Sequence, residues 1–291
     1  MVLLCLFIAL TILQWSTIVN HLHKDQWFYN WLDWLSVRVN TASNPRLFPL
    51  LALACPLLAL SISLALLAKI SLFLVFLVSI VLLLYSFGRG DWIGSVAELR
   101  SAYRTENKDV IEKHVANWLP ESFRRNSDWR EQAVVGIVYY AFELTFVVLF
   151  WFLLLGPVGT VFYRLTTLLK NAKVLEGADN SAVARWHWLL EWPAIRLLGL
   201  SFSFVGNFAG CYRQWKTCFL CLRRDTQTVL AHYIQGALTL YKKPVQYHTV
   251  VSDDDFEDAE DEIEVDIDAA VGLYRRALLF WLCILAILWM L

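Results

Sequence analysis

Long apolar runs separated by short charged segments set the pattern of this chain. Residues 47–67 contain no charge, residues 70–88 follow after the single Lys69, and residues 133–163 contain only Glu143 as a charged residue. A helix needs about 20 mostly apolar residues to cross about 30 Å of hydrocarbon. The pattern therefore predicts an all-α fold, a polytopic integral membrane bundle, in which 47–88 forms a hairpin.

The two ends of the chain and one internal segment decide the number of spans. Residues 1–19 have neither a preceding basic residue nor a small-residue cleavage site, so we expect a retained first span rather than a signal peptide. Residues 271–291 form the last predicted span. Residues 186–209 are apolar but carry Glu191 and Arg196, so this segment either spans the membrane or lies in its interface. The prediction is therefore five or six spans.

Basic residues between the apolar runs predict the orientation. If the chain crosses the membrane six times, most of its Lys and Arg residues lie on the inner side. Positive charges next to membrane helices are favoured on that side. We therefore expect a multi-pass membrane protein whose N-terminus lies outside. The expected segments are 1–19 as first span, 20–46 as cytoplasmic loop, 47–88 as transmembrane hairpin, 89–132 as cytoplasmic helical loop, 133–210 as transmembrane and interfacial core, 211–270 as cytoplasmic segment with an acidic linker, and 271–291 as last span.

The loop 89–132 has a different periodicity from the spans. Its apolar positions recur at intervals of three and four, which is typical of amphipathic helices. A polar pair, Asn107 and Lys108, predicts a break in the middle. We expect two amphipathic helices here.

Composition supports the membrane interpretation. The chain is 58% hydrophobic and 18% charged, whereas soluble domains are about 45–50% apolar and about 25% charged. This composition argues against a soluble single-domain enzyme. Because the basic residues lie between apolar runs and form no continuous footprint, we expect a lipid bilayer, and no nucleic acid, as partner.

The overall charge of −1 conceals one strongly acidic run. Residues 253–268 carry 11 carboxylates and no basic residue, and they contain no glycine, which a calcium-binding EF-hand loop requires. Repulsion between like charges predicts a disordered linker. Two alternatives are docking on a basic partner and docking on the chain's own cytoplasmic helices. Ile263, Val265 and Ile267 alternate with acids, which gives a weak strand signal.

Motifs of the common enzyme classes are missing from the sequence. There is no Walker phosphate loop, no dinucleotide Gly-x-Gly unit and no serine nucleophile elbow. Cys211, Cys218 and Cys221 lack a fourth ligand nearby, so they predict no metal site. We expect no cofactor, and the sequence identifies no catalytic residue, so it favours a non-catalytic protein over an enzyme without deciding between them.

Charged residues inside apolar runs are the candidate ligand-binding residues. Glu143 lies well within its run, where an isolated carboxylate is costly, so we expect it to face the bundle. Arg164 and Arg196 are its possible partners. Trp192 lies close to Arg196, which can bind an anion or extend its head to the membrane surface. The candidate site is therefore Glu143, Arg164, Trp192 and Arg196. The alternative is that these charges only fix helix packing.

Two stretches of the chain resemble a known family. They are the string LFWFLLLGPVG at 149–159 with the following Tyr163-Arg164-Leu165, and the string EWPAIRL at 191–197. Both resemble the AmpE family of bacterial inner-membrane proteins, which is distantly similar to the CobD/CbiB adenosylcobinamide-phosphate synthases. The resemblance implies a signalling modulator linked to β-lactamase induction, antibiotic resistance and cell-wall recycling. Such a modulator would bind an envelope or lipid-linked ligand, or a cytoplasmic or membrane protein partner.

The chain departs from the synthases at one informative place. Where they carry Asn-Thr-Leu-Asp after the Tyr-Arg pair, this chain reads TTLLK at 166–170 and lacks the aspartate. Pro193 is also displaced by one residue from the proline of the synthases. An amide-forming enzyme that uses nucleotide and magnesium is therefore the alternative reading. A non-catalytic membrane scaffold is the third.

Overall fold

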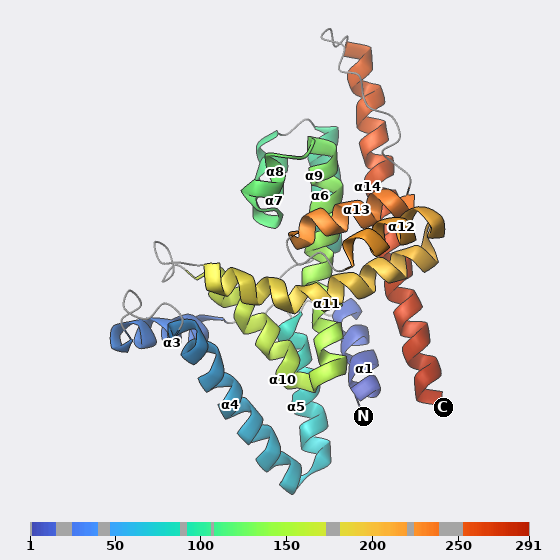
Figure 1. Ribbon diagram of the computed structural model, residues 1–291. Coiled ribbons are helices and arrows are strands. Elements are labelled where there is room, and N and C mark those ends of the chain that lie inside the picture. The colour runs from blue at the N-terminus through green and yellow to red at the C-terminus, as the bar shows by residue number, and fades with distance from the viewer. Residues whose placement is uncertain are drawn as a thin grey trace. The chain divides into compact units, whose positions relative to one another are not determined.

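The computed structural model describes residues 2–15, 25–39, 47–87, 92–105, 108–172, 181–219, 224–238 and 253–290. Every regular element in these ranges is a helix (Figure 1), which confirms the predicted all-α class. The chain forms two compact units, residues 1–89 with 147–191 (unit 1) and residues 90–146 with 192–291 (unit 2).

Unit 1 is built around α10 (Val147–Lys170), which packs against α5 (Leu72–Ser86), α4 (Leu47–Ile70) and α1 (Val2–Trp15). Its core joins α10 to α4 and to α3 (Gln26–Arg38) through Leu165, Leu169, Ala52 and Phe28, all fully buried. Figure 1 shows α4 and α5 meeting at a sharp turn at Ser71. The predicted hairpin is thus present as two antiparallel helices.

Unit 2 is organised by α9 (Trp129–Ala141), which continues into a π-helical turn, η1 (Phe142–Phe146). The other elements are α6 (Trp92–Arg104), α7 (Lys108–Trp118), α8 (Glu121–Arg124), α12 (Phe208–Cys218), α13 (Thr226–Leu238) and α14 (Asp253–Met290). α9 packs against α6, α7, α13 and α14. The helix α11 (Ser181–Val205) belongs to unit 1 up to Glu191 and to unit 2 from Trp192.

Four helices are long and apolar enough to cross a membrane: Leu47–Ile70, Trp129–Lys170, Ala182–Val205 and Ile263–Ile287. They fit a lipid bilayer and include the segment that the sequence left ambiguous. The five or six spans expected from the sequence are not confirmed. α5 has 15 residues, and such a helix is about 22 Å long, shorter than the hydrocarbon layer. The described part of the first predicted span is the 14-residue α1, and its remainder lies outside the described residues.

The amphipathic helices predicted for 89–132 are present as α6 and α7, and α7 begins at Lys108, the predicted break. A third short helix, α8, follows. Apolar positions of both longer helices are buried, among them Leu99 and Val115. The loop is therefore a folded part of unit 2.

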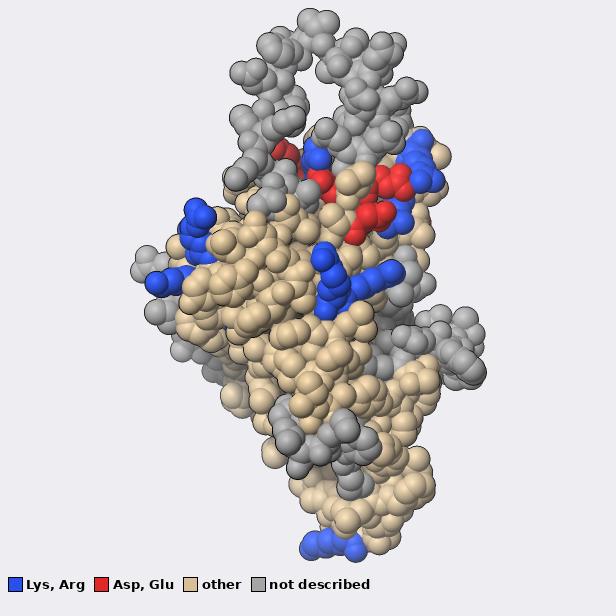
Figure 2. All heavy atoms as spheres, turned by 90° about the vertical axis from the view of Figure 1, so that its right-hand side faces the viewer, with Lys and Arg blue, Asp and Glu red and all other residues tan. Residues whose placement is uncertain are grey.

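The acidic run is helical, so the prediction of a disordered linker is wrong, and so is the strand signal. α14 starts at Asp253 and continues without interruption through the acidic run into the last apolar run. Three arginines of α6 and α9 oppose the repulsion by forming ion pairs, Arg100 with Asp268, Arg104 with Glu264 and Arg130 with Asp266. Acidic and basic side chains lie close together on the face in Figure 2. Within the run, Glu264, Asp266 and Asp268 thus dock on the chain's own helices, as the minor alternative expected.

Candidate functional site

The helix α10 carries the polar residues of unit 1. Gly156 interrupts the helix with φ +65, a left-handed conformation that favours glycine. Pro157 follows, and its missing N–H suits the start of a new helical segment. The second segment brings Tyr163, Arg164 and Thr167 among α3, α5 and α11, where they meet polar partners.

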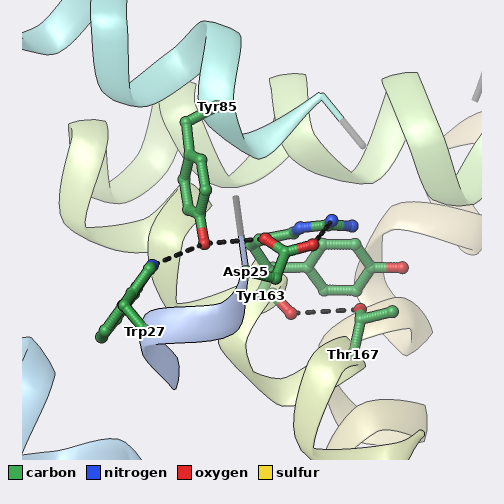
Figure 3. Close-up of polar contacts among 6 residues, drawn as sticks. Asp25, Trp27, Tyr85, Tyr163 and Thr167 are labelled. Atoms are coloured by element: carbon green, nitrogen blue, oxygen red, sulfur yellow. Dashed lines mark hydrogen bonds and ion pairs between the residues drawn. The ribbon is translucent and has the colours of Figure 1, made fainter. Parts of the chain in front are cut away.

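Arg164 forms a shielded ion pair with Asp25, the residue that precedes α3. Arg164 Nη2 lies 2.9 Å from Asp25 Oδ2, and the two side chains are 12% and 7% exposed. Tyr85 Oη donates to the other oxygen, Asp25 Oδ1, at 3.0 Å, and Trp27 Nε1 donates to Tyr85 Oη at 3.3 Å (Figure 3). The pair thus joins three segments of unit 1, and both carboxylate oxygens have donors.

A second polar cluster lies between α10 and α11. Tyr163 Oη donates to Glu191 Oε1 at 3.5 Å, and His187 Nδ1 lies 3.6 Å from the same oxygen. Thr167 Oγ1 lies 3.3 Å from His187 Nε2 and donates to the carbonyl of Tyr163 at 3.2 Å, the contact drawn in Figure 3. We call Tyr163, Thr167, His187 and Glu191 the His187 cluster.

The His187 cluster is nearly inaccessible to water. His187 and Glu191 are each 2% exposed, and the ring of His187 stacks on Tyr163 with centroids 5.5 Å apart. Buried polar groups are costly unless their hydrogen bonds are satisfied. The two ring nitrogens of His187 lie beside a hydroxyl and a carboxylate, so the cluster offers both hydrogen-bond donors and acceptors. The arrangement can therefore bind a small polar group.

Trp192 and Arg196, two of the residues expected to bind a ligand, are brought together in unit 2. The guanidinium carbon of Arg196 lies 5.3 Å from the centre of the Trp192 ring. Arg196 is 4% exposed and its Nε donates to the carbonyl of Phe219 at 3.2 Å. Its side chain is buried and does not extend to the surface, which overturns the snorkelling alternative. The Trp192 Nε1 is buried and has no hydrogen-bond partner among the described residues.

Glu143 lies in η1, where its side chain is half-buried. π-helical turns are uncommon and frequently mark functional positions. Thr145, in the same turn, shares a hydrogen bond of 2.5 Å with the hydroxyl of Tyr274 of α14. That Glu143 faces the bundle and takes part in ligand binding stays a prediction.

Asp25, Tyr85 and His187 were not among the site residues predicted from the sequence. No pattern in the sequence links Asp25 or Tyr85 to Arg164, because Asp25 and Arg164 lie 139 residues apart. His187 could have been found, since it precedes Glu191 by four residues and therefore shares its helix face.

The residues do not fit the magnesium and nucleotide site that the synthase resemblance implies. At 166–170 the oxygens are hydroxyls that donate to their own helix, Thr166 to the carbonyl of Phe162 and Thr167 to that of Tyr163. The buried carboxylates of the described part of unit 1 are Asp25, which is paired with Arg164, and Glu191, which faces an imidazole. Magnesium prefers sets of oxygen ligands with bound water.

Comparison with known proteins gives one partial similarity. No family model matches the chain, and no solved structure matches it. The chain is 36% identical over 81 residues to a protein of Chromobacterium violaceum named cobalamin biosynthesis protein CobD. The match covers 26% of this chain and 25% of that protein. This chain is therefore a helical protein of membrane type with a weak, partial similarity to a cobalamin biosynthesis protein.

Proposed function

We propose that this chain is an AmpE-like modulator of the bacterial inner membrane, which binds an envelope-derived or lipid-linked ligand and thereby affects β-lactamase induction and cell-wall recycling. Its site is the His187 cluster of unit 1. A protein partner would carry the signal onward, and no catalytic step is required.

One observation carries the proposal: the hydrogen bond between Tyr163 and Glu191. These residues come from the two separate strings that resemble AmpE, and they lie 28 residues apart in the sequence. Residues that only filled a core at this place could be apolar at lower cost, because buried ionisable groups lose hydration. The combination of hydroxyl, imidazole and carboxylate favours recognition of a ligand with hydrogen-bonding groups.

The test is genetic complementation with matched variants. A strain lacking the chain should show altered β-lactamase activity after addition of a β-lactam inducer, and the wild-type chain should restore it. Glu191→Gln and Tyr163→Phe keep the side-chain shapes but change the hydrogen bonds, so neither should restore induction fully. Glu121→Gln, which removes an exposed carboxylate on α8, should behave like the wild type.

Protein amount in the membrane fraction is measured in each strain, since a loss of protein would mimic a loss of signalling. Glu191→Gln and Tyr163→Phe that accumulate normally and restore full induction would refute the proposal. Variants that alter thermal stability but leave every phenotype unchanged would instead support a non-catalytic scaffold.

The similarity to the Chromobacterium violaceum protein favours a second candidate, an amide-forming enzyme of cobalamin biosynthesis. It predicts that this chain complements a strain lacking adenosylcobinamide-phosphate synthase. Failure at matched expression would exclude that activity and leave the modulator untouched. Because the acidic ligand of the synthases is missing at 166–170, we expect failure.

A further inference from the structure

The helix α12 has a buried face, an aromatic face and a basic face. Cys211 and Cys218 are fully buried, and no residue of the helix is acidic. With about 100° of rotation per residue, Phe208, Tyr212 and Trp215 fall within a sector of about 60°. Such a segregated helix is typical of proteins that bind a membrane surface.

The aromatic residues form one continuous stripe. Neighbouring rings contact each other from the end of α11 to the end of α12, with centroids 4.6–6.2 Å apart, in the order Phe204, Phe208, Tyr212, Trp215, Phe219. Four of the five side chains are exposed, most of all Phe204 and Phe208, at 58% and 53%. Contiguous exposed apolar surface of this kind marks an interaction site.

Hydrogen bonds hold α12 against α11, so the aromatic stripe has a fixed orientation relative to α11. Trp215 Nε1 donates to the carbonyl of Arg196 at 2.9 Å, and Arg196 Nε donates to the carbonyl of Phe219 at 3.2 Å. Cys211 Sγ contacts the carbonyl of Gly199 at 3.5 Å. The hydrogen bond from Arg196 to the carbonyl of Phe219 explains why Arg196 is buried, because this charge-assisted bond fastens the end of α12.

Contacts with α14 place α12 and the end of α11 near the point where the charged part of α14 ends and its uncharged, apolar part begins. The ring of Phe204 stacks on Phe280 at 5.6 Å, and Trp281 Nε1 donates to Ser201 Oγ at 2.7 Å. On α14 these residues lie four to six positions after the exposed Arg275 and Arg276, which are the last charged residues of the helix. Within unit 2, Figure 1 shows the end of α11 and α12 running across α14, not along it.

Basic residues lie beside the stripe. Arg213 and Lys216 are exposed on α12, next to the aromatic sector. Arg275 and Arg276 add two further positive charges on α14, about one helical turn before its contacts with α11. Aromatic rings at the level of the head groups, flanked by Lys and Arg, are favoured where a protein meets an anionic leaflet.

We propose that α12, with the end of α11, is an interfacial anchor that lies in the plane of the membrane, with its aromatic stripe in the acyl boundary and Arg213 and Lys216 on the phosphates of anionic lipids. If the stripe bound a protein instead, we would expect fewer basic side chains at the rim of the stripe, or acidic side chains on the partner that match them. The coincidence of the stripe with the charged-to-apolar boundary of α14 favours lipid. The anchor is independent of the modulator function.

The first experiment is photocrosslinking of the full chain in nanodiscs of phosphatidylcholine and phosphatidylglycerol. A benzophenone amino acid replaces Tyr212 on the stripe or, as the matched control, Glu112, which is exposed on α7. Position 212 should give lipid adducts by mass spectrometry, and position 112 should give few. Equal adducts at both positions, or adducts of 212 with a protein alone in native membranes, would overturn the anchor.

The second experiment removes the charges. Arg213→Gln with Lys216→Gln should lower the enrichment of phosphatidylglycerol over phosphatidylcholine around the purified protein by at least about twofold, since each basic residue near an anionic surface favours binding. Lys113→Gln with Arg125→Gln changes the same number of exposed charges on α7 and its neighbour. Unchanged enrichment in the first pair, or an equal loss in both, would refute the role of the α12 charges.

Discussion

Asp266 and Arg130 lie 136 residues apart in the chain and form an ion pair in which the carboxylate is 4% exposed and the guanidinium 24% exposed. The pair joins α14 to α9, and it lies between the flanking pairs Arg100 with Asp268 and Arg104 with Glu264. The three pairs oppose the repulsion among the last three carboxylates of the acidic run.

Removing one partner of this pair should strongly destabilise the protein. Arg130→Met leaves the Asp266 carboxylate buried without its cation, which we expect to cost about 3 kcal/mol. The thermal unfolding temperature in detergent should fall by about 6 °C or more. Arg125→Gln breaks an exposed pair with Glu121 and should cost under about 1 kcal/mol. The double variant Arg130→Met with Asp266→Leu should recover most of the loss, and a loss equal to that of Arg130→Met would contradict this reading.

Close contact between α12 and α13 depends on glycine. A Cβ on Gly236 would lie 2.9 Å from both the Cys211 Cα and the Gly210 carbonyl oxygen, and a Cβ on Gly210 would lie 2.3 Å from the Gly236 carbonyl oxygen. Gly236→Ala should therefore force the helices apart and cost about 1–3 kcal/mol. The control is Gly272→Ala on α14, where a Cβ would meet nothing within 4 Å. This substitution should be neutral or slightly stabilising. Unfolding in detergent compares the two, and equal unfolding temperatures would argue against this packing.

The pair of Asp25 and Arg164 should show strong energetic coupling. Asp25→Asn and Arg164→Gln each leave a buried polar group with a lost partner, while the double variant loses both charges together. A double-mutant cycle on unfolding should give a coupling of about 1–3 kcal/mol. Additive effects would mean that the two side chains do not act as a pair.

The thiol of Cys211 should be protected from alkylation. Burial raises the pKa of Cys211 above its usual value, against a smaller lowering by a hydrogen bond from Ser203. Because thiolate is the reactive form, labelling by maleimide at pH 8 should be slow in the folded protein and fast in dodecyl sulfate. Linkage gives the sign for stability: above about pH 8.5 the unfolded chain loses this proton first, so the contribution of Cys211 to stability falls as pH rises. Site-specific mass spectrometry measures the labelling, and rapid modification in the folded state would contradict the burial.

One buried hydroxyl should be dispensable. The Tyr103 Oη is buried without a hydrogen-bond partner among the described residues, and burial raises the pKa of this phenol. Tyr103→Phe removes an unsatisfied group and keeps the ring contact with Trp129. We expect the unfolding free energy to rise by about 1 kcal/mol. A marked loss of thermal stability would show that the hydroxyl has a partner.

Candidate ligand residues show the limits of sequence pattern. The sequence placed Glu143, Arg164, Trp192 and Arg196 in one candidate site. The structure brings Trp192 and Arg196 together, but it pairs Arg164 with Asp25. Residues four apart on one helix are predictable neighbours, whereas a contact across 139 residues depends on how α3 and α10 pack.

The helical class and the apolar helices could be predicted from the sequence, because run length and periodicity are local properties of the chain. The break before α7 could also be predicted. The conformation of the acidic run depends on tertiary contacts, since arginines distant in sequence pair with Glu264, Asp266 and Asp268. The same holds for the His187 cluster, whose Tyr163 hydroxyl and Glu191 carboxylate meet only where α10 and α11 approach each other.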